Sequence, residues 1–579
     1  MPTLGLTILL AASSVADRTA ALHALFDEAW ELRLREDPLF ATQMGEHRFD
    51  ALLPSMRPED LDRRAAYQRD ALARARAIGP EGLSDVDRVS LAMFERQLLD
   101  GIAEDEFGAY RIPINADSGF HTDFADLPNQ MPFATAKDYD SYVQRLAAFP
   151  RYASEEIELM REGLRAGFTV PRVALEGMDA TMRAHVVSDP EKSVFYAPFR
   201  AMPASIPEAE RKRLEAAGRR AILDGTVRGY AELAAFVRDE YLSGARASVG
   251  ASELPRGREY YAHLVRAFTT LDVTPEEVHE TGLREVARIR AEMDATMRRA
   301  GFTGDFAAFL EFLRTDPRFY AKTPEELLAR ASRIAKRMDG KLPSLFGRLP
   351  RQPYGVEPVP EHLAPKYTGG RYVEAPIGGT RAGTYWVNTY ALAMRPFYTL
   401  EALTLHEAVP GHHLQISLQQ ELSGLPAFRR QASVGAFVEG WALYAERLGL
   451  EAGMYEDPYS DFGRLTYEMW RACRLVVDTG LHAKGWTRRQ AIDYLAANTA
   501  LSRHEVTTET DRYISWPGQA LCYKMGELRI RELRRRAESE LGARFDVRGF
   551  HDAVLAQGAV PLSVLDEQVG AWIASRRAK

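Results

Sequence analysis

Residues 405–413 read Leu-His-Glu-Ala-Val-Pro-Gly-His-His, a cluster of histidines around one glutamate. The common zinc peptidase motif carries two histidines four residues apart on one helix, with a glutamate between them as general base. Here the position four residues after His406 is Pro410, whose side chain cannot bind a metal. The next histidines are His412 and His413. The stretch therefore predicts a metal site whose second ligand lies beyond a break in the helix.

The proline and the glycine of this stretch predict where that break falls. Pro410 removes one helical hydrogen bond and clashes with the carbonyl of residue 406, and Gly411 tolerates unusual backbone angles. We expect a helix that starts near Thr399 to kink, bulge or stop between residues 406 and 410. In an ideal helix His412 would lie about 240° around from His406, and His413 about 20° off but roughly 10 Å along the axis. This geometry alone leaves the choice between His412 and His413 open.

A third metal ligand is expected on a later helix. Glu439 is the only carboxylate between Phe437 and Tyr444, a run that is otherwise apolar and aromatic. Such a carboxylate is costly to bury unless it is paired or bound to a metal. Two histidines and one glutamate suit a catalytic zinc ion, which keeps an open position for water. The alternative is an ordinary ion pair between Glu439 and an arginine such as Arg474.

The motif His406-Glu407-x-x-Pro410-Gly411-His412, with Glu439-Gly440-Trp441 downstream, resembles a bacterial domain-of-unknown-function family, number 885. The resemblance covers most of the chain after its first residues. Members of that family look like distant relatives of helical gluzincin-type zinc peptidases. The resemblance implies zinc as the cofactor, His406, His412 and Glu439 as its ligands, and Glu407 as the general base. In the family pattern the histidine after Pro-Gly is the fixed one, which favours His412 over His413.

Two later helices supply further candidate residues. Arg471, Arg474, Asp478 and His482 follow at i, i+3, i+7 and i+11, so they share a helix face. We interpret this face as a cleft wall on which the arginines bind a substrate carboxylate and His482 stabilises an oxyanion. The alternative is a solvent-exposed face.

Beyond Pro517, Tyr523 is predicted to donate a hydrogen bond to the transition state, or else to be a core tyrosine. Gln519 and Lys524, on the same helix, are predicted to bind substrate. The resemblance to gluzincin-type peptidases also implies that the strand Trp386-Val387-Asn388, preceded by Tyr385, binds an extended peptide backbone by edge pairing, with Tyr385 and Asn388 as substrate-binding residues. The stretch Arg258-Glu259-Tyr260-Tyr261 is a lesser candidate for the facing lobe, and the alternative is that its aromatic residues pack before a helix.

The predicted fold is mainly α, a two-lobed metallopeptidase-like body with a deep cleft. Ser84, Thr274, Thr323 and Thr487 each precede a segment of helical periodicity and are expected to cap its start. Residues 101–135 suggest a long ordered loop. A proline-rich region with alternating segments at 371–374 and 384–390 predicts a small β-sheet before the metal-site helix. We expect a helical N-terminal lobe over residues 17–270 and a catalytic lobe over residues 271–579.

Composition narrows the partners and the location. The 74 Lys and Arg against 81 Asp and Glu give a net charge of −7, which argues against nucleic acid as a partner. Residues 4–16 are apolar and end in small residues, which predicts an export signal over residues 1–16; without it the protein would be cytoplasmic. No other stretch reaches the roughly 18 apolar residues of a membrane span, so we expect no stable membrane insertion. The sequence does not indicate an oligomeric state.

Three functions remain after these observations. The first is a zinc metallopeptidase that acts on peptides, and the second is a metal-dependent hydrolase of a non-peptide amide or small metabolite. The third is a non-catalytic helical binding protein whose histidines are satisfied in its core. Bound metal would separate the third function from the other two.

Overall fold

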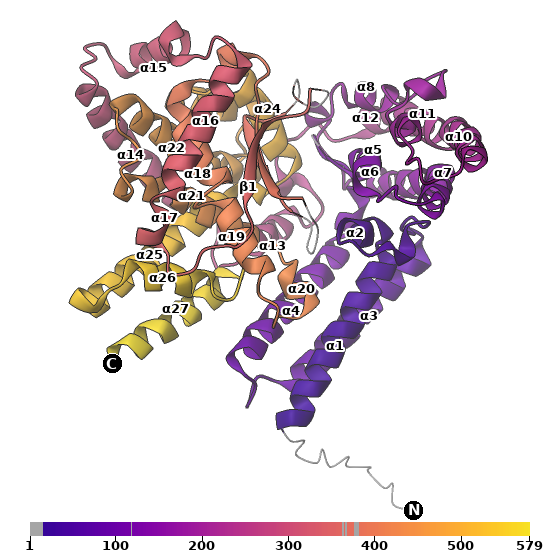
Figure 1. Cartoon of the computed structure of the whole chain (residues 1–579), viewed down its shortest axis with the longest axis horizontal. Helices are drawn as coiled ribbons and strands as arrows, with labels where there is room; N and C mark the ends of the chain where they lie inside the picture. The colour runs from indigo at the N-terminus through magenta and orange to yellow at the C-terminus, as the bar shows by residue number, and fades with distance from the viewer. Residues whose placement is uncertain (1–14, 117, 362–363, 365–366, 376–380, 579) are drawn as a thin grey trace, which may run out of the picture.

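The computed structural model describes residues 15–578 except residues 117, 362–363, 365–366 and 376–380. The predicted export signal therefore lies outside the described residues, apart from Val15 and Ala16. The chain is mainly helical, as predicted. The longer helices of its first half, indigo to magenta in Figure 1, are α1 (Val15–Glu36), α3 (Pro58–Ile78), α4 (Asp85–Phe107), α7 (Ala136–Ala166), α10 (Glu208–Ala221), α11 (Arg228–Phe236) and α13 (Gly257–Thr269).

The second half of the chain contains the helices that build the candidate site, among others. Its longer helices are α14 (Pro275–Arg299), α15 (Phe306–Thr315), α16 (Pro324–Asp339), α18 (Leu400–Glu407), α19 (His412–Gln420), α21 (Gly435–Glu451), α22 (Pro458–Ala483), α23 (Arg488–Asn498), α24 (Arg503–Ser515), α25 (Cys522–Leu541), α26 (Val547–Leu555) and α27 (Leu562–Arg577). The long α22 packs against α14, and α21 packs against both α18 and α25. None of the described helices combines the length and the apolarity needed to cross a membrane.

The helix caps follow the sequence. Ser84 accepts a hydrogen bond from the backbone of Asp87 at the start of α4, and Thr323 accepts one from Glu326 at the start of α16. Thr274 and Thr487 form complete capping boxes, in which the side chain three residues later bonds back to the cap. These local signals fix where the helices begin.

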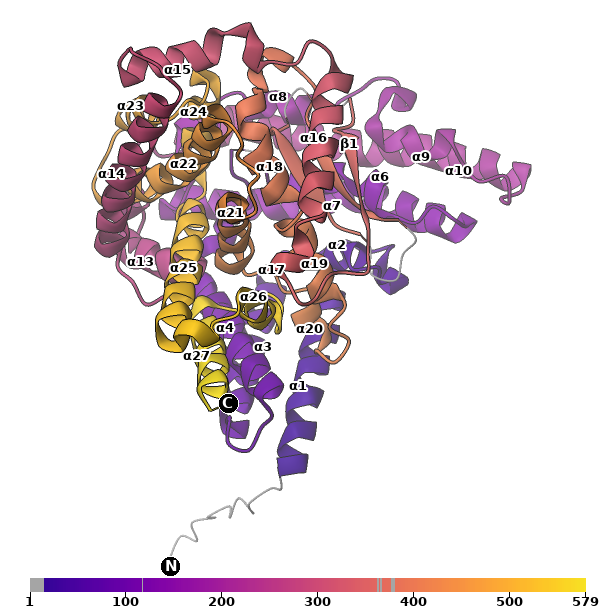
Figure 2. The same cartoon turned by 60° about the vertical axis from the view of Figure 1, so that its left-hand side comes forward.

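A three-stranded sheet stands immediately before α18. Strand β3 (Gly383–Val387) lies in the centre, parallel to β1 (Tyr354–Pro358) and antiparallel to β2 (Gly370–Val373). Figures 1 and 2 both show β1 beside α16, and β2 contacts α18. The sheet confirms the prediction for β2 and β3. The sequence did not predict β1, because proline-rich sequence indicates a break and only an edge strand accommodates it.

The region 101–135 differs from the expected loop. Helix α4 continues to Phe107, and two short helices, α5 (Phe120–Ala125) and α6 (Leu127–Gln130), interrupt the rest. The apolar residues Phe120, Phe124 and Leu127 are buried, and their contribution to the core explains why the segment is ordered as helix.

Both large hydrophobic clusters combine residues from the two halves of the chain. One joins Phe149 of α7 to Met469 of α22, and the other joins Phe94 of α4 to Phe437 of α21. The division into lobes at residue 270, with a deep cleft between them, stays a prediction. The mainly α fold with its small sheet is confirmed.

Candidate metal centre

The helix that carries His406 stops where the sequence predicts a break. Helix α18 ends at Glu407, residues 408–411 form a turn, and α19 starts at His412. At Gly411, an added Cβ would lie 1.9 Å from the carbonyl oxygen of His406, so a larger residue does not fit. The indole Nε1 of Trp441 donates a 2.8 Å hydrogen bond to the Pro410 carbonyl and holds the turn against α21. The two imidazole rings of His406 and His412 consequently meet, with centroids 4.7 Å apart and planes perpendicular.

Glu439 completes the cluster from α21. Its Oε2 lies 3.4 Å from Nε2 of His406 and 3.6 Å from Nε2 of His412. Three potential ligand atoms, one from each residue, lie within 4.8 Å of one another. Zinc ligands about 2.0–2.2 Å from the ion in a tetrahedron are roughly 3.3–3.6 Å apart, which these two separations match. Glu439 Oε2 is buried and has no hydrogen-bond partner among the described residues, so the donor set fits a metal ion.

The close approach of two helices places Glu439. Gly440 of α21 faces Gly526 of α25, and a Cβ on Gly440 would lie 2.5 Å from the Gly526 backbone. This contact brings the N-terminal turns of α25 next to Glu439. The glycine that follows Glu439 in the sequence motif therefore has a packing role beside the metal ligand.

The electrostatics favour the metal-binding protonation states of His412 and Glu439. Burial lowers the pKa of His412 to about 4, which keeps its imidazole neutral. Burial alone would raise the pKa of Glu439, but His406 and His412 outweigh it and lower the value to about 2. A neutral imidazole and an ionised carboxylate are the ligating forms. At His406, burial lowers the pKa of the ring, but the Glu439 and Glu446 carboxylates outweigh it and raise the value to about 9, so metal binding would release a proton from this ring.

Glu446 fixes the orientation of His406. Its Oε1 lies 2.8 Å from Nδ1 of the ring, and the carboxylate is almost completely buried. With Nδ1 as the donor, the lone pair of Nε2 points toward His412 and Glu439. Glu446 was not predicted from the sequence, although it lies seven residues after Glu439 and thus on the same face of α21.

Glu407 lies beside the cluster without belonging to it. The backbone N–H of Tyr372 on β2 donates a 2.8 Å hydrogen bond to one of its carboxylate oxygens. Burial raises the pKa of Glu407 to about 7. The sheet thus holds one oxygen of a buried carboxylate next to the three candidate ligands, in a position suited to a general base.

His413 faces away from the cluster. Its Nδ1 lies 2.9 Å from the Tyr372 hydroxyl and 3.2 Å from the Ser417 hydroxyl, and its ring packs against Tyr354. The structure therefore places His412, and not His413, beside His406.

A cavity of about 760 Å³ opens onto the cluster. His406, Glu407, His412 and Glu439 line it, and so do the sequence candidates Arg471, Arg474, Asn388, Gln519 and Tyr523. Tyr523 stacks on the Arg474 guanidinium, 4.4 Å from its ring centroid, and burial raises the pKa of its hydroxyl to about 12. The hydroxyl therefore remains protonated and can donate a hydrogen bond.

Four predicted site residues are engaged in contacts within the protein, so their side chains are not free for the predicted roles. His482 is fully buried, with one ring nitrogen bonded to the Ala251 backbone N–H and the other to the Tyr513 carbonyl. Lys524 forms buried ion pairs with three glutamates, and Tyr385 is fully buried in the core. The Asn388 amide reaches the cavity wall but donates to the carbonyls of residues 364, 367 and 368.

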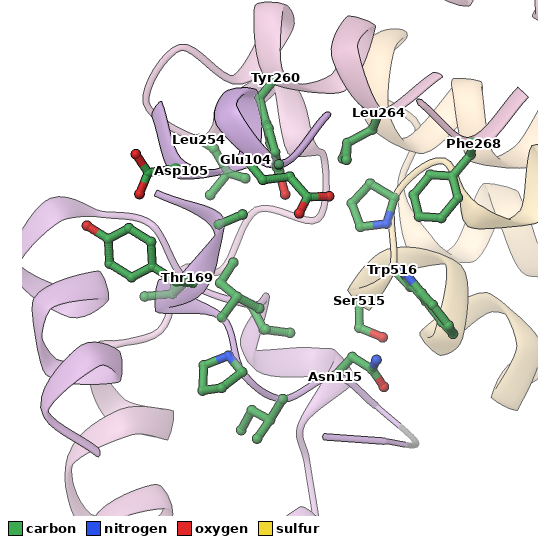
Figure 3. Close-up of a pocket in the computed structure, with 18 of the residues that line it drawn as sticks. Glu104, Asp105, Asn115, Thr169, Leu254, Tyr260, Leu264, Phe268, Ser515 and Trp516 are labelled. Carbon is green, nitrogen blue, oxygen red and sulfur yellow. The ribbon is translucent and has the colours of Figure 1, made fainter. Parts of the chain in front are cut away.

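A second cavity of about 490 Å³ adjoins the first, because Trp516 lines both. Figure 3 shows Glu104 and Tyr260 on one side of it and Asn115 and Ser515 on the other. Tyr260 thus belongs to this second cavity. Its neighbour Tyr261 instead donates a 2.6 Å hydrogen bond to Asp478.

Comparisons with known proteins give a family and two similar structures. A family described as "Bacterial protein of unknown function (DUF885)" matches residues 38–569. A crystal structure of "the putative lipoprotein from Colwellia psychrerythraea" is 29% identical, with a TM-score of 0.91, over 96% of this chain and 100% of that chain. A "putative lipoprotein of unknown function from Shewanella oneidensis" is 19% identical, with a TM-score of 0.68, over 96% of this chain and 99% of that one, which shows a similar fold. No curated protein matches the chain.

Proposed function

The chain belongs to the bacterial DUF885 family, and we propose that this member is a zinc-dependent peptidase that hydrolyses peptide bonds with Glu407 as its general base. One observation carries the proposal: His406, His412 and Glu439 converge on one point of a cavity, with the Glu407 carboxylate beside them. The fold alone does not imply this activity, because one fold supports many functions.

The chain's own residues divide the work of hydrolysis. His406, His412 and Glu439 would hold the zinc ion. Bound there, zinc would supply Lewis acidity, which lowers the pKa of a water ligand and polarises the scissile carbonyl. Glu407 accepts the proton of the attacking water as the oxygen adds to the carbonyl carbon, and it returns that proton to the leaving nitrogen as the C–N bond breaks.

Two further groups support this reaction. Tyr523 donates a hydrogen bond to the oxyanion that forms on the carbonyl oxygen. The Tyr372 backbone holds Glu407 in place through its 2.8 Å hydrogen bond, while Glu446 holds the His406 ring. The proposal is thus supported by a candidate base, a candidate donor for the oxyanion and an oriented set of candidate ligands that line one cavity.

A peptide digest tests the proposal. Protein loaded with zinc is incubated with a mixture of peptides of defined sequence, and the products are identified by mass spectrometry with and without a chelator. We expect cleavage that stops with the chelator and returns with zinc. Cleavage of simple amides but of no peptide would favour the hydrolase of small metabolites, and chelator-insensitive cleavage would contradict the proposal.

We also propose that the protein is exported. The apolar segment at residues 4–16 supports export, and so does the similar Colwellia protein, which is described as a lipoprotein. Expression of the full chain in a bacterium, followed by fractionation and N-terminal sequencing, tests this. We expect a mature form outside the cytoplasm that starts near Asp17, and a full-length chain confined to the cytoplasm would contradict it.

A further inference from the structure

Three arginines form one wall of the cavity that holds the candidate metal centre. Arg471 and Arg474 lie one turn apart on α22, and Arg512 comes from α24. Arg471 and Arg474 are only 5% and 3% exposed, and the side chain of Arg512 is 14% exposed. Three guanidinium groups, which do not lose their charge in proteins, are thus held in a largely buried place.

The fold satisfies these three groups only in part, since they also donate to the Tyr467 carbonyl, the Tyr513 hydroxyl and the Gln519 side-chain oxygen. Nε of Arg471, Nη1 of Arg474 and Nε of Arg512 are buried and have no hydrogen-bond partner among the described residues. Glu509 is shared, at 3.1 Å from Arg474 and 3.0 Å from Arg512. Arg471 approaches Glu446 only to 3.6 Å, and that carboxylate already bonds to His406. Three buried guanidinium charges thus share two carboxylates, and each keeps a nitrogen without a partner in the described part of the chain, so this wall has room for one more anionic partner.

The charge of the whole cavity also favours an anionic partner. Seven arginines and five glutamates line it, and of those glutamates Glu439 belongs to the metal cluster and Glu407 lies beside it. A dication at that centre would add to the positive excess. The cavity therefore favours a ligand with negative charge over a neutral or cationic one.

Aromatic rings hold the guanidinium groups in fixed orientations. Trp470 lies 4.7 Å from Arg471 and 4.3 Å from Arg474, and Tyr467 lies 4.7 Å from Arg471. Tyr523 covers Arg474 at 4.4 Å. Stacking on the planes of the guanidinium groups leaves their N–H edges for hydrogen bonds, which suits a bidentate contact with a carboxylate.

This wall is close to the metal centre. The Glu446 carboxylate bridges Arg471 and His406, because its Oε1 lies 3.6 Å from Nη2 of Arg471 and 2.8 Å from Nδ1 of His406. At the Arg474 end of the wall, Tyr523 contacts the guanidinium group and lines the cavity together with Glu439, so it links this end to the metal centre. An anion bound here would thus lie near the bond that the metal centre attacks.

We propose that Arg471, Arg474 and Arg512 form a subsite for a carboxylate of the substrate, next to the scissile bond. This proposal rests on the proposed hydrolase, since it names the class of substrate that the same cavity accepts. The carboxylate is the free C-terminus of a peptide or an acidic side chain close to the cleaved bond. The subsite makes the enzyme selective for peptides that carry one of these two carboxylates. Peptides that differ only in the position of the carboxylate distinguish them.

Three peptides of otherwise identical sequence test the subsite: a free C-terminal acid, its C-terminal amide, and the amide with an acidic residue at the last position. We expect kcat/KM for at least one carboxylate-bearing peptide to exceed that of the plain amide by roughly 100-fold. A preference for the free acid identifies the C-terminus, and a preference for the acidic amide identifies the side chain. Equal rates on all three peptides would overturn the proposal.

Arginine variants test whether this wall causes the preference for the carboxylate-bearing peptide. Arg474→Gln should lower kcat/KM for the preferred acid strongly but change that of the plain amide little, with zinc content unchanged. Arg535→Gln removes one charge from an exposed arginine of α25 that does not line this cavity, and it serves as the control, with little effect on either peptide. If Arg474→Gln fails to fold, Arg471→Gln replaces it. Equal losses on acid and amide would also overturn the proposal.

A binding measurement separates this proposal from the catalytic one. Zinc-loaded Glu407→Gln protein is titrated calorimetrically with the acid and the amide peptides. Selective binding of the acid without turnover by the wild type would support the subsite and count against the peptidase. Turnover without any preference for the acid in rate or binding would overturn the subsite and leave the peptidase standing.

Discussion

At the residue scale, the candidate metal centre depends on one carboxylate oxygen that faces two imidazole rings. Glu439 Oε2 lies 3.4 Å and 3.6 Å from the Nε2 atoms of His406 and His412. Glu446 on the far side of His406 and the Tyr372 backbone on Glu407 hold the neighbouring groups in place. Each of these contacts predicts a separate effect of substitution.

Replacement of the two adjacent histidines should have opposite results. His412→Ala removes one of the three clustered ligands, so zinc content should fall from about one ion per chain to near zero. His413→Ala is the matched control, because His413 instead contacts the Tyr372 and Ser417 hydroxyls. Zinc content of each purified variant, measured by mass spectrometry, checks this. Loss of zinc only from His413→Ala would refute the assigned ligand set.

Single residues were predictable where the chemistry stands out from its surroundings. His406, Glu407 and His412 form a short motif, and Glu439 is a lone carboxylate in an apolar run. Glu446 was not predictable from the sequence, because a glutamate near the end of a helix ordinarily faces solvent. Its burial results from the packing of α21 against α18, which sequence periodicity does not show.

At the element scale, the turn between α18 and α19 positions the second ligand. The sequence predicted this break from Pro410 and Gly411, and the structure places it at residues 408–411. The face of α22 was harder to interpret. Arg471 and His482 are eleven residues apart, which is roughly 16 Å along a helix. Arg471 therefore reaches the cavity, whereas His482 packs against the segment around Ala251.

Gly411→Ala should damage both stability and zinc binding. The new Cβ would lie 1.9 Å from the His406 carbonyl oxygen, so the turn must shift and move His412 away from His406. We expect a loss of roughly 1–3 kcal/mol in the free energy of unfolding together with weaker zinc binding. Gly424→Ala is the control, since a Cβ added there would have no neighbouring atom within 4 Å. Wild-type zinc affinity in Gly411→Ala would contradict this role of the turn.

Asp478 should make the packing of α22 pH-dependent. Burial raises its pKa to about 7, while Tyr261 and the Gly518 backbone donate hydrogen bonds to it. The folded state therefore binds this proton more tightly than the unfolded chain, whose aspartate pKa is about 3.9. The stabilisation is full below about pH 4 and is lost as the pH rises through about 7.

Asp478→Asn removes that titration. We expect the unfolding free energy of the variant, relative to wild type, to rise by roughly 2–3 kcal/mol between about pH 5 and pH 8. Urea unfolding at both pH values measures it, and a pH-independent difference between the two proteins would count against the assignment.

At the scale of the whole molecule, two hydrophobic clusters join helices from both halves of the chain around the cavity. The helical class and the sheet before α18 followed from periodicity, caps and turn residues. The packing of helices from both halves into shared clusters could not be predicted in this way, because it depends on contacts between residues hundreds of positions apart. Phe94 of α4 and Phe437 of α21, which share one cluster, are such a pair, and the sequence marks neither as a partner of the other.

Removal of zinc should destabilise the whole fold. The ligands come from α18, α19 and α21, so an ion that binds only the folded state stabilises it by mass action. We expect a chelator to lower Tm by several degrees and added zinc to restore it, measured by scanning calorimetry. The His412→Ala variant should show no such response, and an unchanged wild-type Tm would mean that no metal holds these helices together.

The central claim is that a zinc ion at His406, His412 and Glu439 works with Glu407 to hydrolyse a substrate. Glu407→Gln tests it most directly, because the amide keeps the size of the side chain but cannot accept the proton. Zinc content and kcat are measured on the same preparation. We predict about one zinc ion per chain and a fall in kcat of roughly 100-fold or more. Wild-type turnover by the variant, or a wild-type protein that binds no zinc, would contradict the claim.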